Sequence, residues 1–173
     1  IIRNIIQSDE FSKNHQTGFF QPIELPNLTE QYPEKYYNIE GNLFFKVSSD
    51  VDFYLLESLI KKHRYYDSFG VWSPSINCDK HFIASIVLSL GAQSCLEIGC
   101  FSGAVLSLLA DNGVDICGTD ISHLAFLLAY PNTFEKIIFG ELTEIPFSKC
   151  YDVIIAMDIL DHINPLKINN YVI

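Results

Sequence analysis

The sequence is poor in basic residues and has no hydrophobic run long enough to cross a membrane. It contains 11 Lys and Arg against 21 Asp and Glu, which gives a formal charge of −10. A protein that holds a nucleic-acid backbone needs clustered basic side chains, so we expect no nucleic-acid partner. The apolar stretches, such as 82–90 and 124–130, are too short to span a bilayer. We therefore predict no membrane span.

Paired cysteines are lacking as well. The cysteines at positions 78, 95, 100, 117 and 150 are five in number and include no Cys-x-x-Cys pair. This pattern favours neither a disulfide framework nor a zinc site. Several of them lie in apolar runs, so we expect reduced, buried thiols and a cytoplasmic protein. The chain starts at Ile1 without a signal-peptide pattern, and we expect it to be part of a longer protein.

What the sequence does have is enough apolar residues for a globular core. Hydrophobic residues make up 49% of the 173 positions, and charged residues only 18%. Residues 1–48 carry three prolines and no clear period, which predicts an irregular N-terminal extension. Apolar spacing and capping residues then predict two helices, from Ser49 or Asp50 to Arg64 and from about Asp79 to Leu90. We interpret residues 49–91 as a helical cap region.

Strands and helices alternate from residue 92 to the end. The expected strands are 94–98, 114–119, 136–139 and 151–157, and the expected helices between the first three are 103–110 and 122–129. This rhythm predicts a doubly wound, mainly parallel α/β sheet with helices on both faces, in a domain over residues 92–173. The last residues form no finished element, so the sheet looks incomplete at its C-terminal end. A ligand is expected at the carboxyl ends of the strands, where the strand order reverses between the first and fourth strands.

The first of these strands ends in the turn Glu97-Ile98-Gly99-Cys100-Phe101-Ser102-Gly103. Two glycines four residues apart let the backbone turn sharply and approach a ligand, and the following helix offers free N–H groups. The G-x-G-x-x-G spacing of dinucleotide sites fits in neither register, and the P-loop pattern is absent. A turn that only packs a helix on the sheet remains the alternative.

The spacing Glu97-x-Gly99-x-x-x-Gly103 resembles the cofactor-binding signature of the class I S-adenosylmethionine-dependent methyltransferases, which have a Rossmann-like fold. The resemblance extends over residues 94–163 in a consistent order. It implies S-adenosylmethionine as the cofactor, with Gly99, Cys100 and Gly103 lining its methionyl portion and Glu97 helping to hold its ammonium group. A carboxylate suits a cationic amine, whereas it would repel a phosphate.

Two further segments continue the resemblance. Asp120 matches the family's acidic residue that accepts both ribose hydroxyls, and Ile121 follows it in the cofactor-binding set. Residues 140–147 resemble the family's Gly-Asp-x-x-x-x-Pro-Phe stretch, in which Glu141 would meet the adenine amino group and the N–H of Leu142 the ring. Glu141 stands in place of the commoner Asp, so its carboxylate reaches one methylene further.

Residues 151–163 resemble the fourth strand and the helix start that close the family's site, with Asp161 in place of the commoner Glu. Asp158 and His162 are the candidate catalytic residues, and an imidazole suits deprotonation of a hydroxyl nucleophile. Asp158, Asp161 and His162 also invite interpretation as a metal site, in which a carboxylate and the imidazole share an ion, but no further ligand is identifiable nearby, so we predict no metal. The aromatic residues Tyr65, Tyr66, Phe69 and Trp72 form either a lid or a packing cluster.

The resemblance implies an enzyme that transfers the cofactor's methyl group to a small-molecule or glycan acceptor by in-line displacement. Two other functions remain open. One is a non-catalytic module that uses the cofactor fold as a scaffold, and the other is a nucleotide-binding oxidoreductase. No oligomeric state is predicted.

Overall fold

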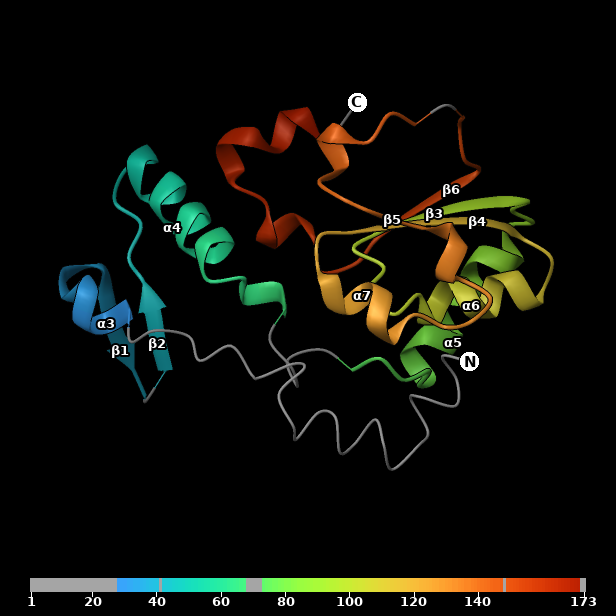
Figure 1. Ribbon diagram of the computed structural model, residues 1–173, viewed down its shortest axis with the longest axis horizontal. Helices are drawn as coiled ribbons and strands as arrows, with labels where there is room; N and C mark the ends of the chain where they lie inside the picture. Colours follow the sequence, from blue (N-terminus) through green and yellow to red (C-terminus); the bar gives the residue numbers. More distant parts are fainter. Residues whose placement is uncertain (1–27, 41, 68–72, 148, 172–173) are drawn as a thin grey trace. The chain divides into compact units, whose positions relative to one another are not determined.

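The computed structural model of the chain describes residues 28–40, 42–67, 73–147 and 149–171. The chain divides into two compact units. The described part of the first unit lies in residues 73–160, and that of the second in residues 28–67 and 161–171. Element labels follow Figure 1.

A four-stranded parallel sheet forms the centre of the first unit. Its strands are β3 (Ser94–Ile98), β4 (Asp115–Asp120), β5 (Ile137–Phe139) and β6 (Val153–Ala156), in the order β5-β4-β3-β6. The first strand of this sheet along the chain lies beside the fourth, so the strand order reverses at β3. The parallel α/β sheet is confirmed, and the strand order reverses at the predicted place.

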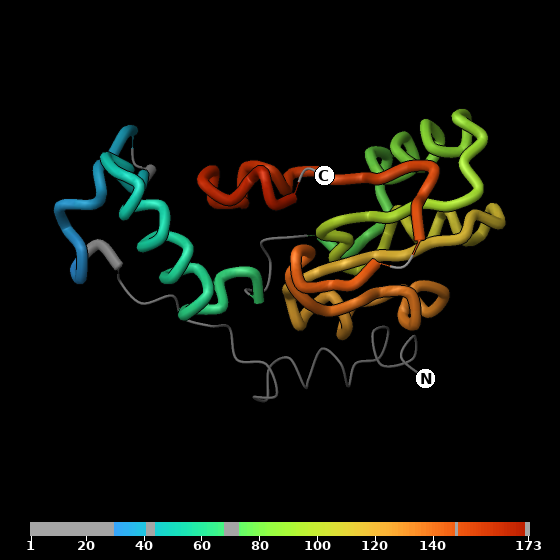
Figure 2. Tube along the Cα trace, turned by 90° about the horizontal axis from the view of Figure 1, so that it is seen from above, coloured from blue at the N-terminus to red at the C-terminus, as the bar shows by residue number. Residues whose placement is uncertain are grey.

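Helices and a loop segment connect the parallel strands, since parallel neighbours require crossovers. Helices α5 (Cys78–Ser89), α6 (Ala104–Asp111) and α7 (His123–Leu128) lie on one side of the sheet in Figure 1. The segment with the short 3-10 helix η4 (Leu142–Glu144) lies on the other side. A further 3-10 helix, η3 (Phe134–Lys136), precedes β5. Figure 2 shows the same unit from above, as the green-to-orange part of the tube.

Each helix of this unit begins at a local signal. The Asn77 side chain accepts a hydrogen bond from the N–H of Lys80 at 3.1 Å at the start of α5. The Ser122 hydroxyl accepts from the N–H of Leu124 at 3.1 Å at the start of α7. Helix α6 begins instead at Gly103, whose φ of 68° lies in the left-handed region.

The core of the first unit packs the sheet against α5 and α6. Its buried members include Val87, Cys95, Leu106, Leu109, Ile116, Ile137 and Ile155. Gly118 in β4 makes room for this packing, because a Cβ there would lie 2.6 Å from both Cys100 Sγ and Leu106 Cδ1. Small residues in the sheet therefore let α6 approach closely.

The second unit contains structure that the sequence did not predict. Strands β1 (Tyr36–Ile39) and β2 (Asn42–Phe45) pair antiparallel, preceded by α3 (Leu28–Gln31) and the 3-10 helix η1 (Pro33–Lys35). Tyr36 lies edge-on to Phe45 with ring centroids 5.4 Å apart, and Tyr37 stacks on Phe44 at 5.6 Å. The expectation of irregular structure is wrong for residues 36–39 and 42–45, because cross-strand aromatic pairs stabilise the two antiparallel strands there.

Helix α4 (Asp50–Lys62) confirms the first predicted helix and leads to the 3-10 helix η2 (Tyr65–Asp67). Asp52 fixes its start by accepting hydrogen bonds from the N–H groups of Ser48 and Ser49, at 2.7 and 3.0 Å. Lys35 also pairs with this carboxylate, and its hydrogen bond is the main reason that the pKa of Asp52 falls to about 2. The helix start is thereby tied to the segment before β1.

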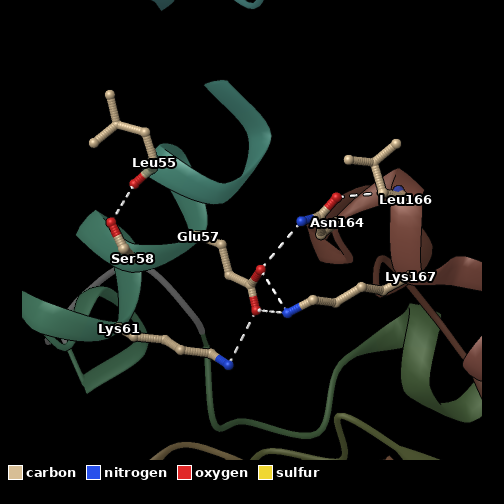
Figure 3. A network of polar contacts seen from close by, with 7 residues as sticks. All are labelled: Leu55, Glu57, Ser58, Lys61, Asn164, Leu166 and Lys167. Atoms are coloured by element: carbon tan, nitrogen blue, oxygen red, sulfur yellow. Dashed lines mark hydrogen bonds and ion pairs between the residues drawn. The ribbon is translucent and has the colours of Figure 1, made fainter. Parts of the chain in front are cut away.

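Glu57 joins α4 to residues near the end of the described chain. Lys167, in the 3-10 helix η6 (Pro165–Asn170), donates to both Glu57 oxygens at 2.7 and 2.8 Å (Figure 3). Asn164 Nδ2 donates to the same carboxylate at 3.1 Å. Burial raises the pKa of Glu57, but these hydrogen bonds outweigh it and lower the pKa to about 2. The network fixes η6 against α4.

All five cysteines are free, with Cys95, Cys100 and Cys117 buried and Cys78 and Cys150 exposed. The expectation of buried thiols is therefore confirmed for three of them. Within the described ranges, no three His, Cys, Asp or Glu side chains gather as metal ligands would. No helix that the structure describes has the length and apolar character of a membrane span.

Leu106→Ala should destabilise the first unit strongly, because the Leu106 side chain of α6 is fully buried against β4. We expect a loss of about 2–5 kcal/mol in the free energy of unfolding, measured by urea denaturation. The control is Leu90→Ala, the same change at a side chain that is 68% exposed. Equal losses for the two variants would contradict this description of the core.

Candidate functional site

The turn after β3 has an unusual backbone. Three of its residues have a left-handed conformation: Gly99 and Gly103 with φ of 68°, and Phe101 with φ of 45°. The N–H groups of Gly99 and Cys100 both donate to the carbonyl of Thr119, at 2.8 and 3.0 Å. The turn is thus fastened to the end of β4. A left-handed conformation is uncommon for a large side chain such as Phe101, so other contacts must hold it.

Asp120, the last residue of β4, provides one of those contacts. Its Oδ2 accepts from the N–H of Phe101 and its Oδ1 from the N–H of Ser122, both at 2.7 Å. The side chain is buried and ties the turn after β3 to the turn after β4. Both oxygens of Asp120 therefore act as hydrogen-bond acceptors at the end of β4.

Glu97 lies one residue before the end of β3 and is only 5% exposed. It pairs in register with Gly118, two residues before Asp120, so Glu97 and Asp120 belong to the same face of the sheet. Its Oε2 atom is buried without a hydrogen-bond partner among the described residues. A buried carboxyl oxygen left in this way destabilises the fold unless a proton or a cation satisfies it.

The surroundings of Glu97 favour its neutral form. Burial is the largest cause, and it raises the pKa of Glu97 to about 8. The nearby charge of Asp120 acts in the same direction, whereas the charge of Lys80 opposes it. A backbone hydrogen bond from Leu106 also lowers the pKa, but less than burial raises it. A cation beside Glu97 would reverse this balance and ionise the carboxyl group.

The ends of β4 and β5 meet at the same edge. The N–H of Gly140, directly after β5, donates to the carbonyl of Asp120 at 3.0 Å. Glu141 follows, half-buried, and Leu142 begins η4. Ile121, next to Asp120, is 45% exposed. The structure therefore brings Glu97, Asp120, Ile121 and Glu141 to the carboxyl edge of the sheet.

Cys100 contributes to the turn through its backbone. Its side chain is buried, and its Sγ atom packs against the Cα of Gly118, where a Cβ would lie 2.6 Å away. Burial raises the pKa of this thiol well above its ordinary range, so it stays neutral. The thiol is a packing group. The backbone of Cys100 helps to close the turn, because its N–H donates to the carbonyl of Thr119 and its carbonyl accepts from the N–H of Gly103 at 2.8 Å.

The two glycines of the turn are each required by a neighbouring side chain. A Cβ at Gly103 would lie 2.8 Å from Thr133 Oγ1, which supports the packing alternative for this glycine. A Cβ at Gly99 would lie 2.0 Å from Ile159 Cδ1 and 2.8 Å from its Cγ1. Ile159 was missed in the sequence. The available signal was a large apolar residue directly after Asp158, at the end of a predicted strand.

The segment before α5 is also held against the turn, which the sequence did not indicate. Ser102 is 1% exposed, and its hydroxyl donates to the carbonyl of Pro74 at 2.9 Å. The N–H of Tyr130 donates to the carbonyl of Ser102 at 3.0 Å. The hydroxyl of Tyr130 accepts a hydrogen bond from the N–H of Ile76 at 3.1 Å. Phe69 and Trp72, expected in an aromatic cluster, lie outside the described residues.

The two candidate catalytic residues belong to different units. Asp158 is exposed, follows β6 in the first unit and has a φ of 52°. His162 belongs to the second unit and ends the 3-10 helix η5 (Leu160–His162). Its Nδ1 lies 3.2 Å from the hydroxyl of Tyr66, whose pKa burial raises to about 12. Tyr66 therefore keeps its proton and shares a hydrogen bond with His162.

Residues 75–169, more than half of the chain, match a family model described as a methyltransferase domain. The chain belongs to this methyltransferase family. The resemblance of the Glu97–Gly103 turn to the class I S-adenosylmethionine-dependent methyltransferases is thereby confirmed at the level of the family. No match was found among curated proteins.

Three solved structures are similar to parts of this methyltransferase chain. The methyltransferase domain of bacterial CtHen1 is 17% identical, with 54% of this chain and 55% of that chain covered and a TM-score of 0.42. The sugar N-methyltransferase KedS8 from Streptoalloteichus sp. is 16% identical, with 70% and 43% covered and a TM-score of 0.40. DesVI from Streptomyces venezuelae is 18% identical, with 65% and 44% covered and a TM-score of 0.40. The chain thus spans about half the length of these proteins.

Glu97→Gln should change how stability depends on pH. In the wild type the folded pKa of about 8 exceeds the ordinary value of 4.5, so Glu97 makes folding less favourable as pH rises from about 4.5 to about 8. Glutamine does not titrate, so the variant should gain more than about 1 kcal/mol relative to wild type between pH 5 and pH 8.5. Urea denaturation at the two pH values measures this change.

The matched control is Glu144→Gln, because Glu144 is an exposed carboxylate of the same unit. This variant should not reproduce the gain of Glu97→Gln between pH 5 and pH 8.5. A Glu97→Gln variant that follows the pH profile of wild type would show that Glu97 is ionised in the folded protein.

Proposed function

We propose that this chain carries the cofactor-binding part of an S-adenosylmethionine-dependent methyltransferase that acts on a small-molecule or glycan acceptor. The observation that carries the proposal is the buried carboxyl group of Glu97, with one unpartnered oxygen, directly before the turn at Gly99. Such a group favours binding of a cationic ligand and disfavours binding of a phosphate. Membership of the methyltransferase family supports the same cofactor.

The polar groups at the strand ends suit the separate parts of the cofactor. Glu97 would hold the ammonium group, and the bare backbone of Gly99 and Cys100 would line the methionyl portion. The carboxyl group of Asp120, whose oxygens accept hydrogen bonds, suits a pair of ribose hydroxyls. Glu141 and the N–H of Leu142 would meet the adenine, with Ile121 against its ring. Gly103 is tightly packed by Thr133, so we assign it to the shape of the turn.

The cofactor, when bound, supplies an activated methyl group on a sulfonium. The chain's part is then to hold the acceptor atom in line with that methyl group. A general base is needed only for an acceptor that is a neutral hydroxyl, and we propose Asp158 and His162 as the candidate groups. The net charge of −10 favours a neutral or small acceptor over a polyanion. We also propose a cytoplasmic location.

The hydrogen bond to Tyr66 limits how His162 could act as a base. If Tyr66 donates to Nδ1, neutral His162 carries its own proton on Nε2 and offers no free lone pair. If Nδ1–H donates to the tyrosine oxygen instead, Nε2 is the basic atom, and it lies 3.7 Å from Asp161. A role as base therefore requires the second tautomer.

Asp120→Ala should weaken binding of S-adenosylhomocysteine by more than about tenfold, because it removes a charged hydrogen-bond acceptor. Isothermal titration calorimetry of the wild type and the variant measures the change. Asp115→Ala is the matched control, since Asp115 is an exposed aspartate at the opposite end of β4. Equal affinities for wild type and Asp120→Ala would remove Asp120 from the site.

The same titration separates the competing functions. A folded wild-type protein that binds no S-adenosylhomocysteine would favour a non-catalytic scaffold. Binding of NADH without binding of S-adenosylhomocysteine would favour a nucleotide-binding oxidoreductase.

A further inference from the structure

The space beside Gly99 is filled by one side chain. The positions of Ile159 Cδ1 and Cγ1, 2.0 and 2.8 Å from where a Cβ of Gly99 would lie, place the end of this side chain against the bare Cα of the turn. This is the backbone that the proposed function assigns to the methionyl portion of the cofactor. A ligand on Gly99 and the side chain of Ile159 therefore compete for the same place.

Ile159 reaches this place from a segment that is otherwise open to solvent. Its neighbours Asp158 and Leu160 are both exposed, whereas Ile159 is half-buried. The left-handed backbone of Asp158, with φ of 52°, turns the chain immediately before it. Aspartate tolerates this conformation better than most residues, but it remains less favourable than an ordinary one. The contact with Gly99 is thus made by a single apolar side chain after a sharp turn.

We propose that Ile159 controls access to the cofactor site, because its side chain occupies the position beside Gly99 and must move before the methionyl portion can bind. This inference rests on the proposed function and adds a residue that determines cofactor affinity. Only the binding-competent arrangement, with Ile159 withdrawn, would accept the cofactor. The apparent affinity is then reduced by the fraction of molecules in which the position beside Gly99 is filled.

A smaller side chain at position 159 should therefore bind the cofactor more tightly. Ile159→Val removes only the Cδ1 methyl group, which makes the closest approach to Gly99. Losing the burial of one methyl group changes the equilibrium by about fourfold, so we expect S-adenosylhomocysteine to bind up to about fourfold more tightly. Ile159→Ala should bind at least as tightly as Ile159→Val. If Ile159 instead packed on the bound cofactor, a smaller side chain would weaken binding.

The experiment is a calorimetric titration of wild type, Ile159→Val and Ile159→Ala with S-adenosylhomocysteine. The matched control is Ile154→Val, the same change at a side chain of β6 that is 60% exposed, and its affinity should equal that of wild type. Thermal unfolding without ligand checks that each variant is folded, and Ile159→Val decides the question if Ile159→Ala does not fold. Unchanged or weaker binding by Ile159→Val would overturn the inference.

Failure of this inference is distinguishable from failure of the proposed function. If wild type binds S-adenosylhomocysteine but truncation at position 159 does not strengthen binding, only the role of Ile159 is wrong. If neither wild type nor any folded variant binds, the proposed function itself is wrong.

Discussion

A carboxyl group buried in a sheet with one unsatisfied oxygen is unstable as an anion, and this constraint acts on Glu97 at the end of β3. The protein holds it as a neutral acid, with a pKa of about 8, or pairs it with a cation. An apolar residue would pack at this position without such a penalty. The proposed cationic ligand would account for a carboxyl group at this position.

The parallel register of β3 and β4 places the end of β4 beside the turn that follows β3. The carbonyl of Thr119 accepts hydrogen bonds from two N–H groups of the turn. The carboxyl group of Asp120 accepts a third, from the N–H of Phe101. The same Asp120 oxygens are the proposed acceptors for ribose hydroxyls, so the residue that shapes the turn would also bind the ligand. The structural contacts of Asp120 were not predicted from the sequence, which indicated the binding role.

The sheet and the strand-end acids were predictable because they depend on local signals. Apolar strands, a Gly-rich turn and acids at strand ends follow one another within residues 94–141. The contacts that were missed join residues far apart in the chain, such as Gly99 with Ile159 and Tyr66 with His162. The pairing of β1 with β2 was missed because its stability comes from contacts between the strands rather than from a period within them. The contact of Gly103 with Thr133 likewise joins segments that are separate in the sequence.

The central claim is that Glu97 is the anchor for a cationic cofactor, and proton release on binding tests it most directly. Calorimetric titration with S-adenosylhomocysteine at pH 7, in two buffers of different ionisation enthalpy, counts the protons released. A carboxyl group with a pKa of about 8 that ionises beside an ammonium should release close to one proton, and Glu97→Gln should release none. Binding of equal affinity by both proteins, with no proton released by wild type, would contradict the account.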